Sequence, residues 1–239
     1  MTTKSGHTLK YLLAIVLASG LSDAACAAPE AGVKTRIRAV LHDPMHPFAE
    51  LYVAGAEGTR IRLNLAMEGL TEPQMVSLPK GLLQLYSSPT FDSAKPLANL
   101  VGSVSVPGDV KQAIIFILPA GEKGKLPYQL MVLNDAYASF ARGESRVINM
   151  TRLPFAITAG EHSLEVAPAR IVAVPRVTRV NAMNQAQTLF YRKVDKEWIM
   201  LSERPMQYTD TLRYIFLVYV MPNVDDPQIR TLLDTSPPP

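Results

Sequence analysis

The sequence predicts an all-β protein made of two tandem β-sandwich domains, and three observations support this class. After residue 33, segments with apolar residues at every second position alternate with glycine- and proline-rich turns. Two longer apolar runs, residues 112–119 and 212–222, each end at a proline. Such runs are typical of strands that are covered on both faces. The order of long and short segments in the first half also recurs about 100 residues later.

The first 27 residues have the pattern of a secretory signal peptide. Lys4 and Lys10 give a basic start, residues 11–21 are apolar, and the small residues that end at Ala27 fit a cleavage site. We therefore expect cleavage after Ala27. The apolar run is shorter than the roughly 20 residues that a membrane-spanning helix needs.

Two alternatives for this segment stay open. It could remain attached as an N-terminal anchor, or the chain could be a lipoprotein acylated at Cys26. Lipoprotein signals usually carry an aliphatic residue three positions before the cysteine, where this chain has Asp23. We expect cleavage at Ala27 to prevail, which would place the mature protein in the periplasm or outside the cell.

Composition excludes several classes of function. Cys26 is the only cysteine, so the mature chain has no thiol nucleophile, no zinc–cysteine site and no disulfide framework. Removal of residues 1–27 takes away two lysines and one aspartate, which lowers the net charge from +3 to +2. So balanced a charge argues against nucleic acid as a partner. No later apolar run reaches membrane-spanning length, so we expect no transmembrane segment in the mature chain.

In the first half, apolar alternation predicts a series of short strands. Ile37, Ala39 and Leu41 share one face of the first of them. The predicted strands are residues 35–41, 48–53, 60–65, 75–78, 82–87, 98–106, 112–118 and 128–133.

The second half repeats this order of elements. Its predicted strands are residues 146–150, 153–161, 163–166, 171–174, 187–192, 198–201, 212–222 and 227–234. Identity between the halves is low, so the matching order alone carries the prediction of an internal duplication. Repeats of about 100 residues with about seven strands each have the size of an immunoglobulin-like sandwich.

The predicted organisation has four parts. A short connector, with a single turn of helix at residues 135–143, separates the repeats. The parts are a signal peptide (1–27), a first β-sandwich domain (33–135), a second β-sandwich domain (144–234) and a proline-rich disordered tail (235–239).

His42, Asp43 and His46 form the most suggestive cluster of metal-ligating residue types. Residues four apart share a face on a helix, but Pro44 and Pro47 rule out a regular helix here. We therefore expect an exposed turn, with a metal site as the alternative. No other motif predicts a catalytic residue or a cofactor, so we expect none.

Aromatic residues could form a sugar-binding platform, because aromatic faces stack on apolar sugar faces. The candidates are Tyr191, Trp198, Phe190 and Tyr214. A lone tryptophan on a middle strand of a sandwich is normally in the core, so we expect Trp198 there.

Asn149-Met150-Thr151 matches an N-glycosylation acceptor, which matters only in a eukaryotic secretory route.

Four arginines recur at alternating positions in two of the predicted strands of the first half, residues 35–41 and 60–65. Arg36, Arg38, Arg60 and Arg62 would then lie on outward faces. A solvated sheet face that discourages edge pairing is the expected role, with an acidic partner as the alternative.

The pattern Arg-Val-Ile-Asn-Met (146–150), Leu-Pro-Phe-Ala-Ile (153–157) and Trp-Ile-Met-Leu (198–201), followed by the strand that ends at Pro222, resembles exported bacterial proteins of unassigned function. The resemblance covers mainly residues 144–234 and implies a β-sandwich class and an extracytoplasmic location. By architecture the chain also resembles periplasmic pilus chaperones, but Phe190-Tyr191-Arg192 falls too late in the chain to be their signature.

We therefore predict a non-enzymatic binding or scaffold protein of the bacterial cell envelope. Its partner would be another envelope protein or a polymer. One alternative is a periplasmic chaperone-like module that offers an exposed strand edge. The second alternative is a metal-dependent enzyme that uses His42 and His46.

Overall fold

A computed structural model describes residues 32–42, 47–55, 59–66, 69–120, 124–221, 224 and 226–235. The predicted signal peptide with Ala27 and Cys26, two of the metal candidates (Asp43 and His46) and residues 236–239 lie outside these ranges. Among the described residues, no helix is long or apolar enough to span a membrane.

Eight strands and one short 3-10 turn make up the described N-terminal half. They are β1 (Val33–Leu41), β2 (Tyr52–Ala54), β3 (Arg60–Arg62), β4 (Gln74–Leu78), η2 (Pro79–Gly81), β5 (Leu82–Tyr86), β6 (Leu100–Ser105), β7 (Gln112–Pro119) and β8 (Tyr128–Asn134). They form two four-stranded sheets, which we call sheet I (order β3-β2-β5-β6) and sheet II (order β4-β1-β7-β8).

Another eight strands make up the described C-terminal half. They are β9 (Ser145–Asn149), β10 (Phe155–Ala159), β11 (His162–Val166), β12 (Arg170–Val174), β13 (Gln185–Val194), β14 (Glu197–Gln207), β15 (Arg213–Tyr219) and β16 (Gln228–Asp234). They form sheet III (order β12-β9-β15-β16) and sheet IV (order β11-β10-β13-β14).

The two halves have the same strand order, since adding eight to each strand number of sheets I and II gives sheets IV and III. The sheets also agree in strand direction. β1 runs parallel to β7, as β9 does to β15, and all other pairs within the sheets are antiparallel. The matching order of elements, with eight strand segments in each half, was predicted from the sequence. That the halves arose by duplication stays a prediction.

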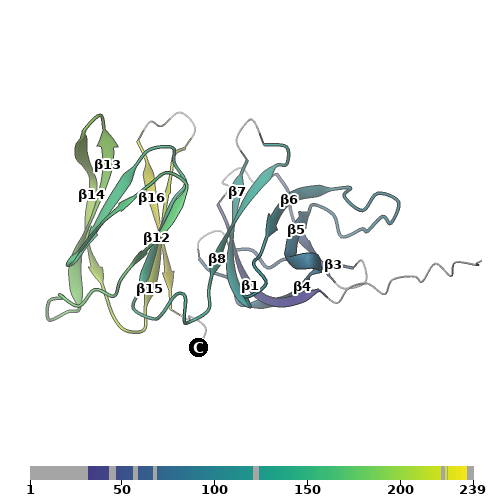
Figure 1. The fold of residues 1–239 in the computed structure, drawn as a ribbon, viewed down its shortest axis with the longest axis horizontal. Coiled ribbons are helices and arrows are strands. Elements are labelled where there is room, and N and C mark those ends of the chain that lie inside the picture. Colours follow the sequence, from purple (N-terminus) through teal and green to yellow (C-terminus); the bar gives the residue numbers. More distant parts are fainter. Residues whose placement is uncertain are drawn as a thin grey trace, which may run out of the picture.

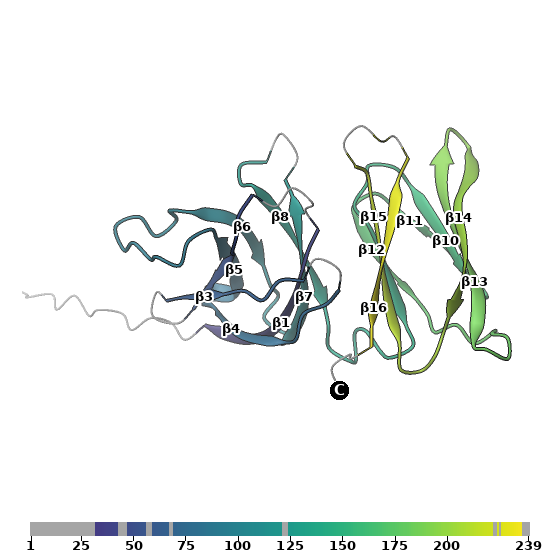
Figure 2. The same ribbon diagram turned by 180° about the vertical axis from the view of Figure 1, so that it is seen from behind.

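The four sheets stack as layers in the order I, II, III, IV (Figures 1 and 2). A first hydrophobic core lies between sheets I and II, and a second lies between sheets III and IV. A third core joins sheets II and III across the two halves. We call this third layer the junction.

The junction explains the two long apolar runs. On β7, Ala113, Ile115 and Ile117 belong to the first core. The alternate residues Ile114 and Phe116 belong to the junction. Successive strand residues point to opposite faces, so a strand that is packed on both faces needs no polar positions. The same holds for β15, whose residues 213–218 are all buried. The prediction that these runs lie inside the sheets, covered on both faces, is confirmed.

Other expectations need correction. Trp198 lies on β14, which is an edge strand rather than a middle strand, and its side chain is half-buried outside the cores. Residues 135–143 form turns, and one of them is closed by the helix-like hydrogen bond from the backbone nitrogen of Phe140 to the carbonyl oxygen of Ala136 at 2.9 Å. Phe140 in these turns is fully buried in the junction, so the connector is part of the packed interior.

Candidate functional site

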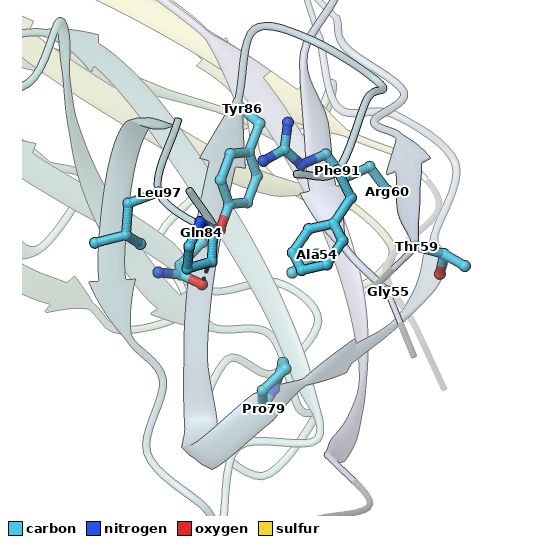
Figure 3. A pocket seen from close by; sticks show the side chains of 10 residues that line it. Ala54, Gly55, Thr59, Arg60, Pro79, Gln84, Tyr86, Phe91 and Leu97 are labelled. Atoms are coloured by element: carbon cyan, nitrogen blue, oxygen red, sulfur yellow. Dashed lines mark hydrogen bonds between the residues drawn. The ribbon is translucent and has the colours of Figure 1, made fainter. Parts of the chain in front are cut away.

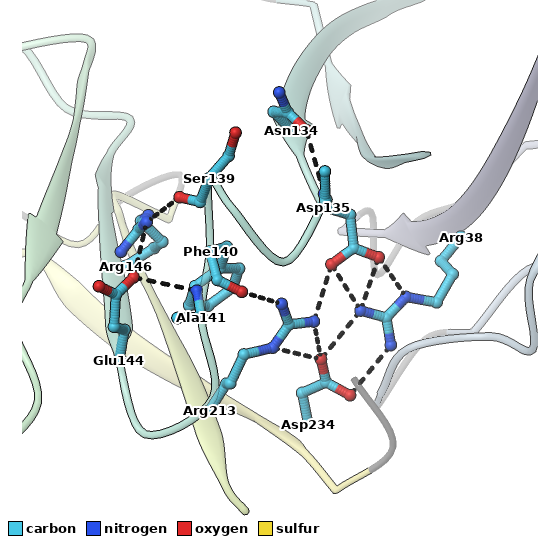
Figure 4. Close-up of polar contacts among 11 residues, drawn as sticks. Arg38, Asn134, Asp135, Ser139, Phe140, Ala141, Glu144, Arg146, Arg213 and Asp234 are labelled. Atoms are coloured by element: carbon cyan, nitrogen blue, oxygen red, sulfur yellow. Dashed lines mark hydrogen bonds and ion pairs between the residues drawn. The ribbon is translucent and has the colours of Figure 1, made fainter. Parts of the chain in front are cut away.

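Four charged side chains meet in the interior at the junction (Figure 4). Arg38 on β1 and Asp135 just after β8 come from the N-terminal half, while Arg213 and Asp234 come from β15 and β16. Arg38 donates to both carboxylates at 2.9 Å. Arg213 donates to Asp135 at 2.7 Å, to Asp234, and to the carbonyl oxygen of Phe140 at 2.7 Å. All four side chains are at most 4% exposed.

The cluster contains two positive and two negative charges, and each half supplies one charge of each sign. Burial alone would raise the pKa of both carboxyls. The hydrogen bonds from the two arginines outweigh this effect at Asp234 and lower its pKa. At Asp135, burial outweighs the same two partners and the pKa stays above its usual value. Buried ion pairs of this kind add little net stability over an apolar replacement, but removal of one partner alone is costly.

The cluster corrects the expectation that Arg38 faces solvent with Arg36, Arg60 and Arg62. Arg38 is 3% exposed and points into the junction. Arg36 is exposed as expected, and Arg62 pairs with Glu50 near the surface. The sequence held no signal for this difference, because alternation along β1 gives the face but not what covers it.

On the outer face of sheet I, Arg60 closes a small pocket of about 180 Å³ (Figure 3). Its guanidinium carbon lies 3.8 Å from the centre of the Tyr86 ring. The same group donates to the carbonyl oxygens of Ser88 (3.0 Å), Thr90 and Ala98 (3.2 Å). Arg60 thereby binds the segment 87–99 over the sheet, and Tyr86 is only 4% exposed.

On the outer face of sheet IV, the corresponding region is open. Phe155 and Ile157 point into the second core, so Ala156 and Thr158 point outward. Ala156 pairs with Glu165 on one side and Tyr191 on the other. Residues directly opposite on antiparallel strands share a face.

These positions line a groove of about 310 Å³, which we call the sheet IV groove. Trp198 completes one wall, and its cross-strand partner Lys193 places its ammonium 5.3 Å from the centre of the indole ring. Thr158 and Ser163 lie opposite each other, with their hydroxyl oxygens 3.0 Å apart.

The structure separates the four aromatic residues that were candidates for a sugar platform. Tyr191 and Trp198 line the sheet IV groove. Phe190 and Tyr214 belong to the second core, where Tyr214 stacks on Phe216 with ring centres 5.9 Å apart. Phe190 and Tyr191 are successive residues of β13, so their side chains point to opposite faces of sheet IV.

Among the metal candidates, only His42 lies in the described residues. Its ring makes an edge contact with Tyr219 at 4.1 Å between centres, and Nδ1 lies 3.2 Å from a guanidinium nitrogen of Arg230. A guanidinium can only donate, so Nδ1 accepts and the imidazole proton sits on Nε2. No group of three or more His, Cys, Asp or Glu in the described part of the chain could hold a metal ion.

Asn149, in the glycosylation-like motif, is fully buried. Its amide nitrogen donates to the carbonyl oxygens of Leu153 (2.8 Å), Val166 (3.0 Å) and Ala167 (3.3 Å). Its oxygen accepts from the backbone and hydroxyl of Thr151. In the folded chain this side chain therefore ties the turn after β9 to the end of β11 and is closed to a glycosyltransferase.

No protein-family model matches the chain, and a search of curated proteins finds no significant relative. The resemblance to exported bacterial proteins therefore stays an expectation from the sequence.

Proposed function

We propose that this chain is a non-enzymatic binding or scaffold protein that is exported to the bacterial cell envelope. The junction supports the proposal. A continuous hydrophobic layer and a buried cluster of four charges hold the halves in one orientation. The most deeply buried charged side chains bond to one another, and none of them lines the pocket on sheet I or the sheet IV groove. The arrangement favours presentation of the two outer faces to partners.

Export is tested by expressing the full chain in a Gram-negative bacterium and measuring the intact mass of the protein released by osmotic shock. We expect a chain that begins at Ala28. A lipid adduct on Cys26 would instead identify a lipoprotein. Full-length protein that stays in the cytoplasm would contradict the proposal.

The binding role is tested by in-cell photo-crosslinking from two equally exposed methionines. Met200 beside the sheet IV groove is 52% exposed, and Met75 at the edge of sheet II is 53% exposed. A crosslinking residue at position 200 should give a discrete adduct with an envelope component, while position 75 serves as the control. Adducts at neither position, or equal diffuse adducts at both, would argue against a binding face on sheet IV.

The chaperone-like alternative has one observation in its favour. β14 spans 11 residues and lies at the edge of sheet IV, whereas natural edge strands are usually kept short. A bulge and Pro205 partly protect this edge. A strand-donating module would lose a co-purifying partner when Ile199→Lys is introduced in β14. Retention of that partner would exclude the edge as the contact.

The metal-dependent alternative predicts metal bound to the purified protein. Elemental analysis of the wild-type chain and of the double variant His42→Ala/His46→Ala measures this directly. Equal metal content in the two proteins would remove these histidines as ligands.

A further inference from the structure

We propose that the sheet IV groove binds an uncharged glycan chain, with Tyr191 and Trp198 as the stacking residues. The inference rests on the proposed binding role and names the class of ligand for one outer face. Its basis is the distribution of side-chain chemistry across the four strands of sheet IV.

Strand register places the groove residues in defined rows. One row crosses the whole sheet as Glu165, Ala156, Tyr191 and Met200, each opposite the next. Because the side chain of Ala156 is a single methyl group, the floor between the carboxylate and the phenol ring is low. A ring-shaped ligand can therefore lie on the sheet between these two walls.

Two cross-strand pairs form the aromatic wall. Tyr191 and Met200 are partners, as are Lys193 and Trp198. The Lys193 ammonium lies 5.3 Å from the centre of the indole ring, within the range of a cation–π contact. Tyrosine and tryptophan have only two side-chain torsions, so they lose little conformational freedom on binding, which favours stacking against the apolar face of a sugar ring.

The polar wall selects for hydroxyl groups. Glu165 offers a carboxylate that accepts hydrogen bonds, while the paired hydroxyls of Thr158 and Ser163 can both donate and accept. An apolar peptide would remove water from the Glu165 carboxylate without replacing its hydrogen bonds. Glu165 would repel an anionic ligand, and Lys193 would repel a cationic one. A neutral, polyhydroxylated chain satisfies both walls.

The equivalent position in the other half supplies a built-in control. A bulge falls between Leu85 and Tyr86 in sheet I and between Phe190 and Tyr191 in sheet IV, so Tyr86 and Tyr191 are equivalent. Arg60 and the segment 87–99 cover Tyr86, whereas Tyr191 lines an open groove. The proposed site is therefore a property of the C-terminal half alone.

The test uses the purified mature chain and three soluble neutral glycans: laminarin, dextran and chitohexaose. Native affinity gels measure retardation by the two polymers, and calorimetry measures binding of the oligosaccharide. We expect at least one glycan to bind. Trp198→Ala and Tyr191→Ala should each weaken that binding about tenfold, since a stacked ring is removed. Phe91→Ala, an exposed aromatic in the pocket of sheet I, should leave it unchanged.

Three results would overturn the proposal: no binding to any of the three glycans, equal binding by the wild type and both groove variants, or binding of poly-L-proline in place of a glycan. Thermal unfolding of each variant confirms that the fold is retained. If the glycans fail while position 200 still gives a discrete adduct in cells, the glycan assignment falls and the binding role stands. If both fail, both proposals fall.

Discussion

The N-terminal and C-terminal halves share their strand order and strand directions, but their interiors differ in chemistry. Equivalent residues can be found from the ladders. Asp135 lies two residues after the cross-strand partner of Ile114. Asp234 lies two residues after the cross-strand partner of Ile215. Those isoleucines pair with Arg38 and Arg146 respectively, which makes the two arginines equivalent. The same register sets Leu41 against Asn149.

A second comparison gives the same result. Leu83 and Thr188 each lie two residues before the bulged position, so they are equivalent. The N-terminal half thus uses leucine at both positions where the C-terminal half uses hydrogen-bonded asparagine and threonine. One strand order can be stabilised by apolar packing or by buried polar networks.

The largest expected effect is a difference in unfolding free energy between variants of the equivalent residues Arg38 and Arg146. Arg38→Met leaves two buried carboxylates with one guanidinium, which should cost about 3–5 kcal/mol of unfolding free energy. Arg146 bonds to Glu144 and to the carbonyl oxygens of Ser139 and Ser145. Arg146→Met should therefore cost about 1–2 kcal/mol. Urea unfolding measures both, and equal losses would show that the junction cluster is not special.

A smaller loss is expected at the position shared by Leu41 and Asn149. Replacing Asn149 with leucine, the residue of the other half, removes donors to one buried and two partly buried carbonyl oxygens, so we expect a loss of about 1–3 kcal/mol. The matched control is Asn181→Leu in an exposed turn, whose side chain makes only exposed hydrogen bonds. A neutral Asn149→Leu would mean that the two interiors are interchangeable.

The pair Thr188 and Tyr208 tests whether the polar network can be replaced. Their hydroxyls lie 2.6 Å apart in the buried interior, and burial raises the pKa of Tyr208 to about 12. Tyr208→Phe should cost about 1 kcal/mol, because it leaves the Thr188 hydroxyl unpaired. The double variant Tyr208→Phe/Thr188→Val should be close to neutral, and calorimetry of the three proteins would show whether stability returns.

The smallest effect is a pH dependence confined to the C-terminal half. Burial opposes ionisation of Glu161, but hydrogen bonds from Thr178 and Arg179 outweigh it and lower the pKa to about 2. The pKa of a glutamate in an unfolded chain is about 4.3. This contribution is therefore complete above that pH and is lost as the pH falls toward 2. Urea midpoints at pH 6, 4 and 2.5 should fall less in Glu161→Gln than in the wild type; parallel curves would contradict this.

The sequence predicted the class of the fold and the order of its elements because both depend on local patterns. Period-2 alternation and proline or glycine turns locate strands in a single chain. The continuous apolar run of β15 showed that both its faces are covered. It could not show that one of these faces packs against the other half of the chain, because the residue types on a buried face do not identify what packs against it.

The candidate site was less predictable for the same reason. Tyr191 and Trp198 were considered together, but the lone tryptophan was expected in the core because β14 was taken as a middle strand. Edge or central placement depends on pairing with distant segments, which residue type alone does not determine. Arg38 was misplaced in the same way, since the Asp135 and Asp234 carboxylates that explain its burial lie 97 and 196 residues away in the sequence.

The packing of β7 and β15 on both faces has a mechanical consequence. Three inter-sheet spacings of about 10 Å separate the outermost sheets by about 30 Å. Neither central sheet can slide without opening two apolar layers at once. A load applied at one end of the stack therefore reaches the other end without being absorbed by a hinge. Two partners bound to the two outermost sheets would therefore stay at a fixed distance from each other.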